Sequence, residues 1–354
     1  MRRHNRVTRE LLLPGLYVLG LVLYALRLHR LLIWLRRRSP TVLAYHACEP
    51  GTTPFIVGRR YVLTPDAFAA QLDFLCSVYN VVDLAALEAG VAPPDRAVAI
   101  TIDDGLRSTL TRMLPALRAH AVPARVYLVT GVLNNVGLIW THELAWVLRT
   151  YPAIARAIAA PILGTAPDAP IEAFLTRARD RCQAVQVERL LTELRAELGY
   201  DPAAVAAGAE LYLGDADLAE LADAGLSFGN HTVSHYNLAR LDSGACAAEI
   251  LGAAARLADV PGAVPSLAFP FGRRNEETRQ VALALGIGSL AEVGGSNARF
   301  DRTRIARVSV THQSVGGLFA QMAVVEPAKA WLARARARAR RRGKGVGRVL
   351  GRVG

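Results

Sequence analysis

Four side chains at two distant points of the chain have the types and spacing of a hydrolytic metal site. Asp103 and Asp104 follow an apolar run, and His231 and His235 lie four positions apart. Two histidines at positions i and i+4 share one face of a helical turn and can bind one cation. One carboxylate from elsewhere completes three ligands and leaves positions open for water and substrate. Because the aspartates are adjacent, we expect one to bind the metal and the other to act as general base.

Taken separately, each motif has a plainer interpretation. An Asp-Asp-Gly sequence after a strand is also an ordinary turn, and paired histidines also occur on surfaces and in cores. Their surroundings favour the functional interpretation, because the strand-like stretches 97–102 and 226–228 directly precede them. In an α/β barrel, the carboxyl ends of the strands carry the chemistry.

Strand-like and helix-like segments alternate from Thr41 onward, which predicts an α/β fold with a mainly parallel sheet or barrel. Between about residues 140 and 212 the pattern is mostly helical, which predicts an insertion. The expected strands are 42–45, 78–82, 97–102, 124–129, 226–228, 266–269, 287–291 and 305–310. The expected helices include 66–76, 109–120, 215–224 and 243–258.

The formal net charge of +12 is concentrated at the two ends of the chain. Residues 1–38 carry a net charge of +8 and residues 327–354 carry +10, so the body, 39–326, has a net charge of −6. A nucleic-acid enzyme would carry positive charge on the body that holds its site, so we expect no nucleic-acid partner. The four cysteines are widely spread and indicate neither a structural zinc site nor a disulfide framework.

An uncharged, leucine-rich run of 16 residues, 11–26, lies between arginines. As a helix it spans roughly 24 Å, short of the ~30 Å hydrocarbon core, although flanking arginines and the apolar stretch 31–35 extend it. We predict a membrane-associating segment at 1–38, with a buried N-terminal helix as the alternative and an anionic membrane surface as the partner. The side of the membrane stays open, since four arginines precede the run and five follow it. The tail, 327–354, is predicted to be a solvated basic extension.

Several motifs, whose order along the chain also matches, resemble those of the polysaccharide deacetylases, whose shared unit is the NodB homology domain of the carbohydrate esterase family 4 type. The sequence around Asp103 and Asp104 resembles the family's Thr-Phe-Asp-Asp-Gly motif, with Ile102 in place of Phe. The two histidines fit its His-Thr/Ser-x-x-His motif. The stretches 42–46, 268–272 and 304–310 are similar to segments of the exopolysaccharide branch. The resemblance covers most of residues 41–310.

This resemblance implies a distorted (β/α)7 barrel with one divalent metal, most often Zn²⁺, bound by Asp104, His231 and His235. Asp103 would be the general base, and a metal-bound water would attack the acetyl carbonyl. The implied activity is that of a hydrolase of carbon–nitrogen bonds, a polysaccharide N-deacetylase. The catalytic domain would be residues 39–326, including the insertion.

The chain departs from the wider family where many members have an arginine that orients the base. Ala268 to Pro270 lacks it, and Arg273, Arg274 and Arg307 are the candidate replacements. For the acid that protonates the departing amine, we favour His46 at the end of the first strand over His312. We predict that Pro270, Phe271 and, more weakly, Trp140 contact substrate; packing within the insertion is the alternative for Trp140.

The sequence as a whole therefore predicts a membrane-associated, metal-dependent enzyme. It would remove N-acetyl groups from a polysaccharide or a lipid-linked glycan. Two alternatives stay open: an amidase acting on a non-carbohydrate amide, and a catalytically silent domain that binds glycan. Retention of both carboxylates and both histidines argues against silence, because a pure binder has no use for a spare carboxylate.

Overall fold

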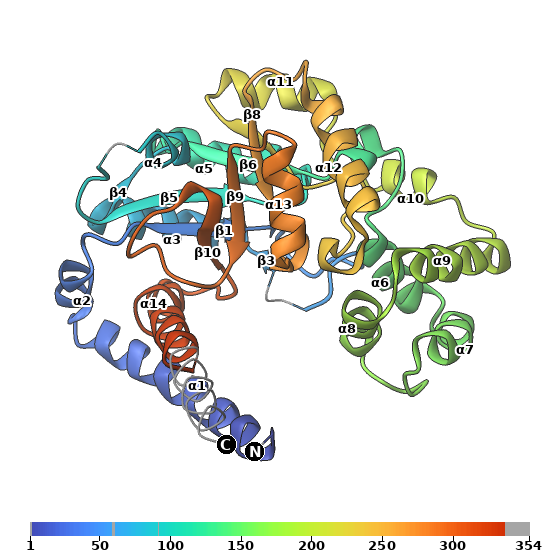
Figure 1. Ribbon diagram of the computed structural model, residues 1–354, viewed down its shortest axis with the longest axis horizontal. Helices are drawn as coiled ribbons and strands as arrows, with labels where there is room; N and C mark the ends of the chain where they lie inside the picture. The colour runs from blue at the N-terminus through green and yellow to red at the C-terminus, as the bar shows by residue number, and fades with distance from the viewer. Residues whose placement is uncertain (1, 59–60, 91, 337–354) are drawn as a thin grey trace, which may run out of the picture.

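Seven parallel strands close into a barrel in the computed structural model, which describes residues 2–58, 61–90 and 92–336 (Figure 1). The ring closes because the first strand, β1, pairs with both β10 and β5. This architecture confirms the predicted distorted (β/α)7 barrel. Around the ring, the strands are β1 (Thr41–Tyr45), β10 (Ile305–Ser309), β9 (Ser289–Val293), β8 (Ala263–Ala268), β7 (Ser227–Asn230), β6 (Ala124–Leu128) and β5 (Ala97–Ile102).

The barrel strands are apolar because most are covered on both faces. All six residues of β5 are buried, and its sequence has no polar–apolar alternation, as expected for a central parallel strand. The strand predicted at 78–82 is wrong in its extent: Val78 ends helix α3 (Pro65–Val78), and β4 comprises only Asn80–Val81. Leu72, Leu75 and Val78 recur at helical spacing, so this apolar run continues the buried face of α3. A separate two-stranded sheet pairs β2 (Ala47–Cys48) with β3 (Val62–Leu63).

Helices cover the outside of the barrel, and their start signals lie in the sequence. The Thr64 hydroxyl accepts from the backbone N–H of Ala67 at the start of α3, and Asp242 caps α12 (Ser243–Leu257) in the same way. The remaining helices of the barrel are α4 (Leu84–Glu88), α5 (Leu114–Ala119), α11 (Asp215–Asp223) and α13 (Glu276–Ala284). Short helical turns are η1 (Thr109–Met113), η2 (Thr130–Asn135), η3 (Leu238–Arg240), η4 (Pro270–Gly272) and η5 (Arg302–Arg304).

The predicted helical insertion forms a separate lobe between β6 and β7, on one side of the barrel (Figure 1, green). It has its own apolar core, which includes Leu144, Phe174 and Leu190. A partly buried ion pair joins two of its helices: Arg195 donates two hydrogen bonds, of 2.7 and 2.6 Å, to the carboxylate of Glu143. Its helices are α6 (Trp140–Thr150), α7 (Pro152–Leu163), α8 (Ile171–Arg181), α9 (Ala184–Leu198) and α10 (Pro202–Gly208).

The N-terminal helix α1 (Arg2–Ala25) packs along α14 (Val315–Ala320) and η6 (Gln321–Val325), and these helices extend away from the barrel (Figure 1). Gly20 permits the close approach, because a Cβ there would lie 2.5 Å from the Cβ of Ala320. Tyr24 contacts Phe319, with ring centroids 5.8 Å apart. After a bend of 111°, α2 (His29–Leu35) returns towards the barrel and buries Ile33.

Within the described residues, no single helix is long and apolar enough to cross a membrane. Leu12–Ala25 and His29–Leu35 meet that requirement of length and composition only as a bent pair. In the basic tail, helical backbone continues from η6 to residue 336, and residues 333–336 are exposed. The rest of the predicted tail, 337–354, lies outside the described residues.

Candidate metal centre and active-site cavity

The two adjacent aspartates point in different directions because the chain turns sharply after β5. Asp104 has a φ of 77° and Gly105 a φ of 70°, so two successive residues are left-handed. This conformation is unfavourable for a residue with a side chain, and such strain is concentrated at functional sites. The backbone N–H of Asp103 still donates to the carbonyl of Tyr45, so Asp103 keeps its place beside β1.

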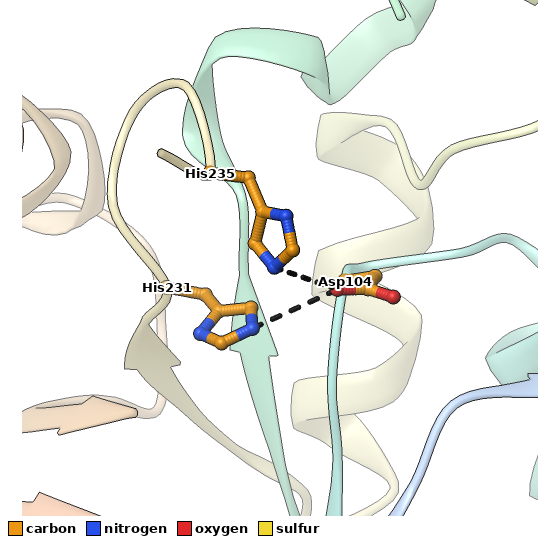
Figure 2. A group of neighbouring side chains, drawn as sticks. All are labelled: Asp104, His231 and His235. Carbon is orange, nitrogen blue, oxygen red and sulfur yellow. Dashed lines mark ion pairs between the residues drawn. The ribbon is translucent and has the colours of Figure 1, made fainter. Parts of the chain in front are cut away.

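Asp104, His231 and His235 form a compact group at the carboxyl ends of β5 and β7 (Figure 2). The Asp104 Oδ1 atom lies 3.6 Å from Nε2 of His231 and 3.5 Å from Nε2 of His235. Ligand atoms about 2.1 Å from a cation in tetrahedral geometry lie about 3.4 Å from one another. The three side chains are therefore spaced for one shared cation rather than for direct hydrogen bonds.

The hydrogen-bonding state of the three side chains also fits a cation. The Nδ1 atom of His231 lies 2.7 Å from the carbonyl oxygen of Ala268, to which it donates, so Nε2 presents its lone pair to Asp104. Asp104 Oδ1 is buried and has no hydrogen-bond partner among the described residues. A buried carboxylate oxygen without a partner is costly, and a cation between it and the two imidazoles removes that cost.

Burial and the neighbouring charge of Asp103 raise the pKa of Asp104 to about 8, against a smaller lowering by Arg307. Both effects disfavour the charged carboxylate in the absence of a cation. Burial likewise lowers the pKa of His231 and of His235. Both histidines are then neutral, which is the form that binds a metal.

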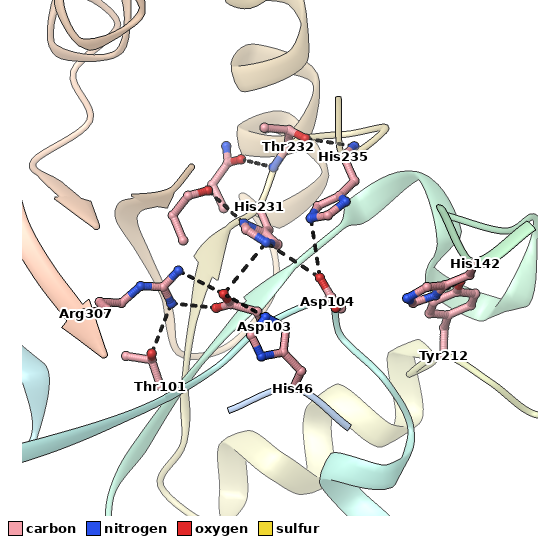
Figure 3. A network of polar contacts seen from close by, with 12 residues as sticks. His46, Thr101, Asp103, Asp104, His142, Tyr212, His231, Thr232, His235 and Arg307 are labelled. Atoms are coloured by element: carbon pink, nitrogen blue, oxygen red, sulfur yellow. Dashed lines mark hydrogen bonds and ion pairs between the residues drawn. The ribbon is translucent and has the colours of Figure 1, made fainter. Parts of the chain in front are cut away.

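Asp103 is held by Arg307 from β10, which resolves the choice among the three candidate arginines (Figure 3). The guanidinium donates two hydrogen bonds to the carboxylate, with Nη1–Oδ1 at 2.6 Å and Nη2–Oδ2 at 2.8 Å. Burial raises the pKa of Asp103, but the charge of Arg307 and smaller effects of His231 and His46 outweigh it and lower this pKa to about 2. Asp103 is thus ionised at any pH at which the protein would normally function.

His46 directly follows β1 and also lies close to Asp103, with its Nε2 atom 3.9 Å from Asp103 Oδ2. Its ring is also close to Tyr61, with centroids 5.1 Å apart. Burial lowers the pKa of His46 to about 4, despite the opposing effect of Asp103. The charges of Arg307 and His231 act in the same direction as burial, so the resting imidazole is neutral at pH 7.

Asp103, Asp104 and the histidines 46, 231 and 235 line a cavity of ≈ 210 Å³ whose wall contains both polar and apolar side chains. Phe271 lines it, and its ring contacts that of His235 edge-on, with centroids 4.5 Å apart. Other parts of the wall come from the segment 55–57 and from the insertion, which contributes Thr141, His142, Leu175 and Arg179. The cavity therefore lies between the barrel and the insertion.

Two of the predicted substrate contacts, Trp140 and Pro270, lie behind the cavity instead of in its wall. Trp140 is buried, and its indole N–H donates to the carbonyl of His235 at 3.0 Å. Its ring also stacks on Tyr236, so its position is that of a packing residue that supports the histidine loop. Pro270 is buried beside Phe271 and does not line the cavity.

His312 is remote from this cavity. Its ring stacks on Tyr17 of α1, with centroids 4.5 Å apart, and its Nδ1 lies 3.2 Å from the tyrosine oxygen. His46 lines the cavity beside Asp103, and His312 does not. Leu175 and Arg179 were not predicted, because nothing in the pattern of α8 shows that this helix docks against the barrel mouth.

Comparison with known proteins supports the same fold. Residues 171–289, about a third of the chain, match the family model described as polysaccharide deacetylase. The deacetylase PplD of Streptococcus pyogenes, solved in complex with acetate, superposes with a TM-score of 0.52 at 17% identity, over 80% of this chain and 98% of its own. IcaB from Ammonifex degensii superposes with a TM-score of 0.53 at 18% sequence identity, over 81% of this chain and 98% of its own. A polysaccharide deacetylase from Bacillus cereus superposes with a TM-score of 0.53 at 14% sequence identity, over 80% of this chain and 69% of its own. A sequence search of curated proteins finds no match.

The chain has the (β/α)7 barrel fold of the polysaccharide deacetylases to which it is similar, with a group of aspartates and histidines at the carboxyl-terminal mouth. The structural likenesses, all at low identity, establish the shared fold, and the family match adds the segment that contains His231 and His235. The predicted resemblance to the polysaccharide deacetylases is thereby confirmed.

Proposed function

We propose that this protein is a metal-dependent de-N-acetylase of a polysaccharide or lipid-linked glycan. The observation that carries the proposal is the position of Asp104 Oδ1, which is buried, has no hydrogen-bond partner among the described residues, and lies near the Nε2 atoms of two neutral histidines. When bound there, a divalent cation such as Zn²⁺ supplies Lewis acidity that polarises an amide carbonyl and acidifies water. The Streptococcus pyogenes deacetylase of the same fold binds acetate, the acid product of this reaction.

Asp103 is the proposed general base. Its carboxylate is ionised and its orientation is fixed by two hydrogen bonds from Arg307, so it can accept a proton without first moving. A carboxylate has about four acceptor directions, and Arg307 uses two of them. The remaining directions can accept the proton of the attacking water.

His46 is the proposed donor of the proton that the departing amine requires. Since the resting imidazole is neutral, it must first gain a proton, and the nearest source is the proton taken up by Asp103. The charge of Arg307 disfavours the protonated form of Asp103, which favours onward transfer of the proton. The Nε2–Oδ2 distance of 3.9 Å exceeds a hydrogen bond, so the two groups must approach by about 1 Å.

Amine release from a panel of N-acetylated glycans tests the proposal. The protein, reconstituted with zinc or cobalt, should release amine and acetate in equal amounts, and a chelator or the Asp103→Asn substitution should abolish the release. Asp168→Asn, which changes a carboxylate in the insertion away from the cavity, is the matched control. Turnover of small non-carbohydrate amides alone would indicate the amidase, and glycan binding without turnover would indicate the silent domain.

We further propose that the N-terminal segment associates with an anionic membrane surface. The helices α1 and α2 leave apolar side chains exposed, among them Leu19, Val22 and Trp34. Arginines 27, 30 and 38 are exposed on the same segment. Apolar side chains that insert at the acyl boundary, together with arginines that face lipid phosphates, are typical of helices that lie in a membrane interface.

A further inference from the structure

His142, in the first turn of α6, lines the cavity and has no role in the proposed proton transfers. Its ring lies nearly parallel to that of Tyr212, with an interplanar angle of 8° and centroids 6.0 Å apart (Figure 3). The Nδ1 atom is 2.8 Å from the tyrosine oxygen. The Nδ1 atom of His142 is therefore engaged in a hydrogen bond with Tyr212.

The position of the shared hydrogen follows from a second contact of Tyr212. Its oxygen lies 3.0 Å from the backbone nitrogen of Ile139, which can only donate, so the tyrosine oxygen accepts there. Tyr212 is fully buried, and among the described residues its own hydrogen has no acceptor other than His142 Nδ1. If Nδ1 carried a hydrogen, the phenol hydrogen would be buried without a partner, at a cost of about 1–3 kcal/mol.

His142 is therefore the neutral tautomer with its hydrogen on Nε2. Burial, with a smaller effect of His46, lowers the pKa of His142 to about 3, so the ring does not gain a second proton at neutral pH. The Nε2–H group belongs to a side chain that lines the cavity, and it is a donor only.

Tyr212 is itself fixed to the loop that holds the aspartates. The backbone of Tyr212 pairs with that of Leu106 in an antiparallel bridge. The backbone N–H of the next residue, Leu213, donates to the carbonyl of Gly105 at 3.0 Å. On the other side, the amide side chain of Asn135 accepts from the Tyr212 N–H at 2.8 Å and donates to its carbonyl at 3.3 Å. These contacts connect His142, through Tyr212, to the loop at residues 104–106, and so fix the position of His142 relative to Asp104.

We propose that Nε2–H of His142 donates a hydrogen bond to an oxygen of the bound N-acetylated sugar, and that Tyr212 acts as a positioning residue that fixes the tautomer. The identity of the ligand rests on the proposed function, whereas the tautomer does not. The group would orient the sugar before reaction. Its loss is expected to raise KM roughly 2- to 13-fold, the range that corresponds to one neutral hydrogen bond, and to change kcat little.

Nuclear magnetic resonance of the zinc-loaded protein with ¹⁵N-labelled histidine tests the tautomer without any activity. The His142 signals are assigned by their loss in His142→Gln. We expect the Nε2–H tautomer from pH 5 to pH 9 in the wild type and a mixture of tautomers in Tyr212→Phe. Tyr200→Phe is the matched control, because it removes a tyrosine hydroxyl that donates to Glu143 in the same insertion. A hydrogen on Nδ1 in the wild type would overturn the proposal.

Three substitutions and a titration test the contact with substrate. His142→Gln keeps a donor near Nε2 and should nearly preserve KM, whereas His142→Asn and His142→Phe should raise it. Titration of Asp103→Asn protein with an N-acetylglucosamine oligomer should shift the His142 Nε2 signal. Binding that leaves this signal and all three KM values unchanged would refute the donor role. Binding and a shift without turnover by the wild type would contradict the proposed function alone.

Discussion

At the scale of single residues, two adjacent carboxylates acquire opposite properties from their surroundings. Arg307 holds Asp103 ionised, whereas burial and the like charge of Asp103 raise the pKa of Asp104. Paired titratable groups whose environments separate their pKa values are typical of acid–base sites. The left-handed turn at Asp104 is what directs the two side chains into these different surroundings.

Replacement of each aspartate should therefore have a different consequence. Asp103→Asn should retain about one zinc per chain and lose on the order of 10²–10⁴ in rate, the range for acid–base groups. Asp104→Asn should lose zinc affinity, as should His231→Ala. Elemental analysis of the reconstituted proteins, together with kcat, measures both effects. Loss of zinc from Asp103→Asn with retention in Asp104→Asn would show that the two roles are reversed.

Removal of Arg307 should move the pH dependence of the reaction in a definite direction. Without the guanidinium, burial dominates and the pKa of Asp103 rises, so the base becomes protonated at a higher pH. The acid limb of the kcat profile, measured at saturating zinc, should shift upward in Arg307→Met and less in Arg307→Lys. By the same linkage, wild-type Asp103 stabilises the fold above its unfolded pKa of about 3.9, and this contribution is lost as pH falls through about 2.

Arg125→Met is the matched control for that experiment. Arg125 is also a buried barrel arginine, but it donates to Glu88 at 2.6 Å and has no contact with Asp103. It should lower stability without a shift of the acid limb. An acid limb that moves equally in both variants would mean that general damage to the barrel, rather than the state of Asp103, controls the rate.

The local sequence was sufficient to predict the candidate metal ligands, but not the residues that hold them in place or line the cavity beside them. Asp103, Asp104, His231 and His235 lie in two short motifs with characteristic spacing, so their proximity could be predicted. Arg307 lies on the last strand, and only barrel closure brings it to Asp103. Arg179 belongs to the insertion, and Tyr212 lies at its end. Their amphipathic patterns reveal a packed face but not the surface on which that face docks.

At the scale of elements, the strand–helix alternation predicted the barrel, and the least accurate boundaries were at short, edge-like strands such as β4. The contact between α1 and α14 could not be predicted, since periodicity within α1 does not identify its partner. Residues 1–38 contact α14 and α3, with Tyr24 near both Phe319 and Phe74. An independently folded unit of residues 39–326 stays a prediction.

Two glycines of α1 provide a direct test of this helix contact. Gly20→Ala should destabilise the protein by about 1–3 kcal/mol, because the new Cβ would overlap Ala320. Gly15→Ala has no atom within 4 Å of its Cβ and should stabilise the helix by about 0.5–1 kcal/mol. Thermal unfolding of both variants measures the difference. Equal behaviour of the two would mean that α1 does not pack on α14 in solution.

At the scale of the whole molecule, charge is segregated along the chain: both ends are basic and the body between them is acidic. Anionic lipid would attract the ends and repel the body. The barrel mouth would then stay in water while the helices contact the headgroups. The attraction weakens at high salt, because charges are screened over about 8 Å at physiological ionic strength.

Sedimentation with phosphatidylglycerol vesicles tests the membrane contact. A variant with serine at Leu19, Val22 and Trp34 should remain in the supernatant at salt concentrations at which the wild type sediments. The matched control places serine at Ile154 and Val185, which are exposed apolar residues of the insertion. A wild-type chain that stays in the supernatant even at low salt would leave the membrane proposal without support.

The pairing of α1 with α14 has a consequence for synthesis on the ribosome. About 290 residues separate the end of the first helix from the start of its partner, so at about 5–20 residues per second the apolar N-terminal segment waits on the order of 15–60 s for that partner. The barrel also cannot close until β10, which directly precedes α14, has been synthesised, since β1 pairs with β10. Throughout this interval the face of the leucine-rich helix that will contact α14 is uncovered. Whatever binds that helix first, a chaperone or a lipid surface, acts before the enzyme has a folded active site.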